Sequence, residues 1–185
     1  MKAIYVMTIW AVILSSLGCT STRRMSRKFS EKPAVIYRQF AGVDYANTPI
    51  HKEGHVSAGA LWESLSYYRL EKTELPEVGE GAVVRLWLTN RDTLTVRAME
   101  DEQVVGSFEI PVRRRGKYLI LERKVSMIPI PVLYFSSHED KTILAPLADG
   151  SIGYYSYNDE TLWILFFGAS QTSNVIHEYQ PVEQR

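Results

Sequence analysis

The chain has 185 residues, of which 45% are hydrophobic and 23% are charged, a composition typical of a folded protein of one domain. The 21 basic residues equal the 21 acidic residues, so the formal net charge is zero and no overall positive field favours nucleic acid as a partner. The single cysteine excludes an internal disulfide bond and any metal site built from several cysteines.

The chain begins with a segment that has the pattern of an export signal. Met1 and Lys2 provide a short positive start, and residues 3–14 form an apolar run that is too short to span a bilayer comfortably. Small residues then lead to Gly18 and Cys19, as a peptidase acting at the membrane surface requires. This pattern resembles the lipobox of bacterial lipoproteins, and the resemblance covers residues 1–19 only.

The resemblance implies a lipid-anchored protein of the cell envelope. Residues 1–18 would be a cleaved signal peptide, and Cys19 would carry a diacylglycerol on its thiol and an acyl chain on its amine. Thr20, in place of an aspartate after the cysteine, favours the outer membrane, with the domain facing the periplasm. Ser16 departs from the commonest form of the lipobox. An ordinary secretory signal, or an uncleaved helix with an incidental cysteine, is the alternative interpretation.

Residues 19–32 are predicted to be the lipidated cysteine and a flexible tether, because this stretch is polar and has no apolar periodicity. Its basic side chains lie within reach of the anchor and could contact anionic head groups; the alternative is a solvated linker that its charges keep extended. These side chains are Arg23, Arg24, Arg27 and Lys28. Residues 33–181 are treated as one domain and residues 182–185 as a tail, because no repeat interrupts the domain.

The domain is predicted to begin with an extended segment at residues 33–42 and a short helix at residues 57–65. In the helix, four apolar residues have the spacing of one buried face, and Ser57 is available as the N-cap. The four apolar residues are Ala58, Leu61, Trp62 and Leu65.

From residue 82 onward, the pattern changes to the alternation of β-strands. Segments rich in turn residues, such as 138–141, 158–160 and 170–174, separate the later strands. We therefore predict a mainly β fold, in which an antiparallel meander closes into a small up-and-down barrel, lipocalin-like in its strand pattern, or into a sandwich. Strands are predicted at 82–89, 93–99, 103–110, 117–123, 132–136, 142–147, 151–157, 161–167 and 175–179.

The sequence contains no local catalytic or metal-binding constellation, and no cofactor is expected. His51 and His55 are four residues apart, but Glu53 stands at neither position that a zinc-peptidase motif requires. His138 and the two acidic residues after it have no candidate nucleophile nearby and are interpreted as a charged turn. Enzymatic activity is left open and is not favoured, since a site assembled from distant residues has no local motif.

Residues 125–135 are the longest apolar stretch after the signal. Pro129 and Pro131 remove ladder donors, so the segment is not expected to be a regular central strand. It is interpreted as a contact strip for an apolar ligand or a partner, or as core packing beside a bend. The strip consists of Met127, Ile128, Ile130 and Leu133.

A second candidate contact site is the cationic run at the predicted turn between two strands. It could meet phosphate-bearing lipid or an acidic partner, and the alternative is a solvated hairpin loop. The run consists of Arg113, Arg114 and Arg115.

Membrane anchoring together with the lack of a catalytic motif favours a binding or envelope-accessory module. We expect the periplasm-facing domain to take an apolar small molecule in a barrel mouth or to dock on an envelope protein. The membrane would be contacted through the lipid on Cys19, and no nucleic acid is expected as a partner. The alternative function is a hydrolase that acts on envelope material.

Overall fold

The computed structural model describes residues 22–34, 40–53, 59–121, 127–130, 134–164 and 167–182. Two short helices, α2 (Thr22–Ser26) and α3 (Leu61–Ser66), accompany the strands. The strands are β1 (Ala41–Ala46), β2 (His51–Glu53), β3 (Val83–Asn90), β4 (Thr93–Glu100), β5 (Gln103–Arg115), β6 (Tyr118–Leu121), β7 (Met127–Ile130), β8 (Tyr134–Pro146), β9 (Ile152–Ile164) and β10 (Phe167–Tyr179).

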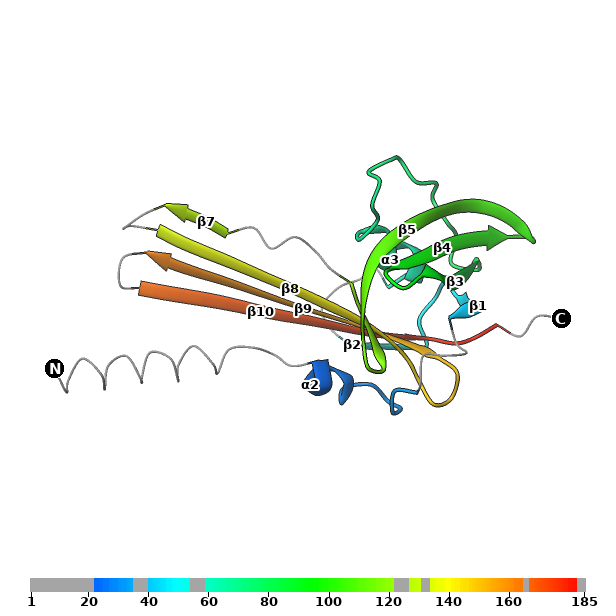
Figure 1. The fold of residues 1–185 in the computed structure, drawn as a ribbon, viewed down its shortest axis with the longest axis horizontal. Helices are drawn as coiled ribbons and strands as arrows, with labels where there is room; N and C mark the ends of the chain where they lie inside the picture. Colours follow the sequence, from blue (N-terminus) through cyan, green and yellow to red (C-terminus); the bar gives the residue numbers. More distant parts are fainter. Residues whose placement is uncertain are drawn as a thin grey trace.

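All of these strands belong to one antiparallel sheet (Figure 1). Its order is β1, β3, β4, β5, β6, β8, β9, β10 and β2, and β7 pairs with β8 beside this path. The prediction of a mainly β fold with an antiparallel meander is confirmed. The long β5 joins the two parts of the sheet, because it pairs with β4 as far as Pro111 and with β6 from Val112 onward.

The strands β8, β9 and β10 form an arm that extends well beyond the rest of the sheet (Figure 1). Each has 13 residues, so the prediction of turns at 138–141, 158–160 and 170–174 is wrong. These polar segments instead pair with one another, with His138 opposite Glu160 and Asp159 opposite Thr172. The strand pairing provides hydrogen bonds for the backbone N–H and C=O groups, and the polar residues lie next to one another across the strands. This pairing overrides the local preference of these residues for a turn.

The two ends of the sheet path come close together at the body of the molecule. An isolated bridge pairs Tyr45 of β1 with Pro181, just after β10, and the Ala46 amide donates to the Gln180 carbonyl over 2.9 Å. On the same side, the Asp44 carboxylate forms a two-bonded ion pair with Arg85, at 2.5 and 2.7 Å. Among the described residues, no continuous ladder joins β1 to β2, so the sheet is linked here by single contacts.

The helix α3 packs against the inner face of the curved sheet and occupies the space that the sheet encloses. Leu61, Trp62 and Leu65 are buried there, as the apolar spacing predicts, and the Trp62 ring lies 4.7 Å from that of Phe108. The helix begins at Leu61 and not at residue 57. Its first amides are held by Asn47, whose main-chain carbonyl accepts from Leu61 over 2.8 Å and whose side-chain oxygen accepts from Trp62 over 2.9 Å. Ser57 and Ala58 lie outside the described residues.

The helix α2 and the residues after it pack on the opposite face of the arm. Met25 is 1% exposed and Phe29 is 7% exposed, in a cluster with Ile143 and Ile176. The Ser30 amide and hydroxyl both donate to the buried Glu178 carboxylate. Residues 22–32 are therefore part of the folded domain, and the prediction that they form a flexible tether is wrong. The burial of Met25 and Phe29 stabilises this packing. Two apolar residues in a polar segment are too few to produce a helical or strand periodicity, so the sequence pattern did not predict it.

Candidate binding pocket

A pocket of about 430 Å³ lies between α3 and the face of the arm that α2 leaves uncovered. One wall comes from the exposed side of α3, and the other comes from alternate residues of the three arm strands. The lining residues are Glu63, Ser64, Tyr67, Tyr68, Asp140, Tyr154, Ser156, Asn158, Ser173, Val175 and His177.

The strand register explains why these side chains meet. Asp140 of β8 is opposite Asn158 of β9, which is opposite Ser173 of β10. One layer nearer the body, Ser156 is opposite Val175. Directly opposite residues of antiparallel strands share a face, so the side chains of Asp140, Asn158, Ser173 and Ser156 lie together on this wall, with Val175 beside them.

A chain of hydroxyl groups crosses the floor of the pocket. The Tyr68 and Thr142 hydroxyl oxygens are 2.6 Å apart, and the Thr142 hydroxyl donates to Ser156 over 2.9 Å. Burial raises the pKa of the nearby Tyr154 well above its ordinary value, and the neighbouring Tyr68 raises it further. Tyr154 therefore stays neutral at physiological pH and acts as a hydrogen-bonding group without charge.

His177 closes the inner end of the pocket. It is 2% exposed, its ring is stacked at 6.0 Å on that of Tyr154, and its Nδ1 is 3.2 Å from the Tyr179 hydroxyl oxygen. The Tyr179 hydroxyl donates its one proton to the Gly59 carbonyl over 2.5 Å. Because that proton is already used, the Tyr179 hydroxyl oxygen accepts the hydrogen bond from Nδ1 of His177. A neutral His177 ring therefore carries its proton on Nδ1 and has its lone pair on Nε2.

The charged groups that line the pocket are the carboxylates of Glu63 and Asp140. Glu63 is exposed at the rim and Asp140 is half-buried. The Asn158 side-chain oxygen is buried and accepts no hydrogen bond from the described residues. Such a wall suits a ligand that is neutral or cationic and carries several hydrogen-bond donors.

The predicted apolar strip does not lie at the mouth of a barrel. Met127, Ile128 and Ile130 belong to β7, which pairs with Ser137, Ser136 and Tyr134 of β8 at the far end of the arm (Figure 1). As expected from the prolines, β7 is an edge strand and pairs with β8 alone among the described residues. Leu133 lies outside these residues.

The cationic run at residues 113–115 is placed in the last part of β5 and not in a loop. All three arginines are exposed. The turn follows them, at Gly116 and Lys117, and Gly116 has a φ of 62°, which glycine adopts without strain. Cys19 and His55 lie outside the described residues, while His51 is in β2 opposite Glu178 and His138 is in the arm opposite Glu160.

Sequence reasoning therefore missed the pocket and its histidine. The available signal is the polar residue at every second position in 140–142 and 156–158, which fits one face of a strand as well as it fits a turn. Composition alone favours turns at these positions, and the register between the strands is not visible along the chain.

Within the described ranges, no group of three or more histidine, cysteine, aspartate or glutamate residues could hold a metal ion. No helix in this part of the chain is long and apolar enough to cross a membrane. Comparison of the chain with protein-family models, with curated proteins and with solved structures gave no match.

Proposed function

We propose that the protein is a lipid-anchored binding or accessory module of the bacterial envelope, held in the outer membrane and facing the periplasm. The anchoring part of the proposal is supported by residues 1–19, where an apolar run leads to Gly18 and Cys19. The binding part is supported by one observation, the pocket between α3 and the arm, whose lining combines tyrosine rings with hydroxyl, amide and carboxylate groups.

The pocket also changes the expected class of ligand. An apolar molecule in a barrel mouth would need the space inside the curved sheet, and α3 occupies that space with Leu61, Trp62 and Leu65. The pocket offers hydroxyls, an amide oxygen and carboxylates beside the Tyr67 and Tyr154 rings. We propose a polar ligand with several donors, such as a saccharide or peptide segment of envelope material or of an envelope protein.

The pocket is tested by filling it. Ser173→Trp places an indole on the pocket wall, while Ser170→Trp, three residues earlier on β10, changes an exposed serine that does not line the pocket. Thermal shifts of the full chain are measured with chitotetraose, a cell-wall tetrapeptide and a fatty acid. We expect a polar probe to stabilise the wild type and Ser170→Trp and to lose its effect on Ser173→Trp. Stabilisation by the fatty acid alone, or by no probe, would contradict the proposal.

The anchor is tested separately. Metabolic labelling with a fatty-acid analogue is expected to label the wild type and not Cys19→Ser, and mass spectrometry is expected to find the chain beginning at an acylated Cys19. An unmodified thiol or an intact leader in the native host would overturn the assigned compartment.

A hydrolase acting on envelope material is the second candidate. One observation favours it: His177, whose Nε2 carries the lone pair in the neutral ring, lines the same pocket as three serines and Asp140. An activity screen on envelope polymers, followed by His177→Gln, tests this function, with His51, His55 and His138 replaced as comparison positions. Activity that survives in His177→Gln would exclude this residue as the base.

A further inference from the structure

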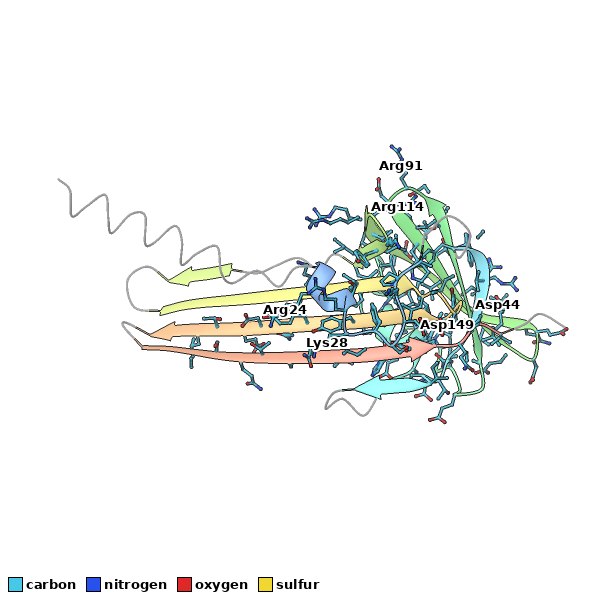
Figure 2. The ribbon with its side chains drawn as sticks, turned by 90° about the horizontal axis from the view of Figure 1, so that it is seen from below. Arg24, Lys28, Asp44, Arg91, Arg114 and Asp149 are labelled. Carbon is cyan, nitrogen blue, oxygen red and sulfur yellow. The ribbon has the colours of Figure 1, made fainter. Side chains whose placement is uncertain are left out.

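Two basic segments that are far apart in the sequence lie side by side in the fold. One is α2 with the turn after it, and the other is the end of β5 with the turn into β6. Ser26 and Tyr118 join them through hydroxyl oxygens 3.0 Å apart, and the Lys117 ammonium donates to the Pro33 carbonyl over 2.9 Å. Figure 2 shows Arg24 and Lys28 around α2, with Arg114 on the neighbouring strand. The six cations called the basic face below are Arg24, Arg27, Lys28, Arg113, Arg115 and Lys117.

The strand register places two of the three consecutive arginines on the side of α2. Arg113 is opposite Ile120 and Arg115 is opposite Tyr118. Ile120 and Tyr118 pack in the cluster that holds α2. Because directly opposite residues share a face, Arg113 and Arg115 lie on this side of the sheet, and the alternation sends Arg114 to the other side.

The basic face has a clear excess of positive charge. Its six side chains are exposed. Among the described residues, the carboxylates on this side of the sheet include the exposed Glu31, in the segment after α2. Further out are Asp159 with the directly opposite Glu139, and Glu53, which is opposite Ile176. Glu178 is buried and accepts from Ser30. The excess of positive charge is therefore local to α2 and to the turn between β5 and β6. A surface of this charge is attracted to anionic lipid head groups, and the attraction of several cations adds up.

The basic face lies close to the proposed anchor, and this proximity favours the bilayer as its partner. The helix α2 begins at Thr22, three residues after Cys19. Three residues reach at most about 11 Å, close to the screening length of about 8–10 Å at physiological salt. Acyl chains on Cys19 would therefore hold the basic face at the head groups, without a long tether between them.

We propose that the basic face docks the folded domain directly on an anionic bilayer, so that the side of α2 faces the lipid and the pocket on the other side of the arm stays open. The inference rests on the proposed acylation of Cys19. It gives the domain a defined orientation at the membrane, which a flexible tether would not.

The test uses the mature lipoprotein reconstituted into vesicles of phosphatidylcholine, alone or mixed with phosphatidylglycerol. The rate of chemical acetylation is measured at each lysine by mass spectrometry, with Lys72, on the loop after α3, as the internal reference. We expect Lys28 and Lys117 to react about five-fold or more slowly in the mixed vesicles, and added salt to reverse the effect. Arg115→Glu should weaken the protection, and Arg114→Glu, on the other face, should preserve it.

Mass spectrometry of Cys19 in the same samples separates this inference from the proposed function. Equal rates at Lys28 and Lys117 in both kinds of vesicle, with Cys19 acylated, would overturn the docking while anchoring stands. If Cys19 is unmodified, anchoring fails, and sedimentation of the protein with mixed vesicles decides whether the basic face binds lipid at all. Stronger protection by soluble polyphosphate than by vesicles would identify an acidic polymer as the partner and overturn the bilayer assignment.

Discussion

Tyr45 is a fully buried side chain whose hydroxyl has no hydrogen-bond partner in the described part of the chain. An unsatisfied buried hydroxyl lowers the stability of the fold, whereas a ring without it fits the same space. Tyr45→Phe is therefore expected to keep or raise the free energy of unfolding, by up to about 1 kcal/mol. Chemical denaturation measures it.

The matched comparison is Tyr179→Phe, which removes a hydroxyl that donates to the Gly59 carbonyl. This substitution leaves the buried carbonyl unpaired and should lower the free energy of unfolding by about 1–2 kcal/mol. An equal loss in the two variants would show that Tyr45 has a partner.

Asn47 supports the start of α3 from a distant part of the chain. Its side-chain oxygen accepts from the Trp62 amide over 2.9 Å, and its side-chain nitrogen donates to the Gly79 carbonyl over 2.9 Å. Asn47→Ala removes both bonds from a buried position and is expected to lower the free energy of unfolding by about 2 kcal/mol. The exposed Asn174→Ala is the control, and a thermal melt that is the same for both would contradict the role of Asn47 as a cap.

At the scale of the elements, the fold depends on the close approach of α2 to the arm. A Cβ built on Gly153 of β9 would lie 2.5 Å from the Phe29 ring, whereas a Cβ on Gly81 meets nothing within 4 Å. Gly153→Ala should therefore displace the segment after α2 and lower the free energy of unfolding by about 1–3 kcal/mol, and Gly81→Ala should not. Faster tryptic cleavage at Arg24 and Arg27 in Gly153→Ala would show that the segment has been released.

The outer part of the arm shows how an element departs from its local pattern. The continuous apolar run at 162–167 is typical of a strand covered on both sides. The structure pairs Leu162 with Ser136 and Ile164 with Tyr134, at the far end of the arm and away from α3. The apolar run lies away from α3 because β8 and β9 each have 13 residues, and strands of this length extend beyond the body of the sheet.

At the scale of the whole molecule, buried tyrosines predict the response to alkaline pH. Burial raises the pKa of Tyr45, Tyr154 and Tyr179 above the ordinary value of 10.0. The folded state then holds protons that the unfolded state releases, so their contribution to stability is complete below about pH 10 and falls as the pH rises above it.

Denaturation of the full chain between about pH 8 and pH 11 should show this fall. Replacing a buried tyrosine by phenylalanine, as in Tyr45→Phe, should make the fall shallower. The exposed Tyr67→Phe should leave it unchanged. A stability that is flat across pH 10 would contradict the raised pKa values.

The sequence alone was sufficient to predict the fold class and the strands at 83–100, because two-residue alternation reports which side of a strand is buried. It also predicted the buried face of α3, since the spacing of Leu61, Trp62 and Leu65 is a local property of a helix. The signal pattern of residues 1–19 is likewise local and stays a prediction about the anchor.

Tertiary structure alone decided the continuity of the arm, the packing of residues 22–34 and both surfaces from which function is argued. Each depends on which segment lies beside which: the register that pairs Asp140, Asn158 and Ser173, and the contact of Ser26 with Tyr118. Such contacts join residues up to 148 positions apart, as in the bond from Ser30 to Glu178, and composition and periodicity describe only the neighbours of a residue along the chain.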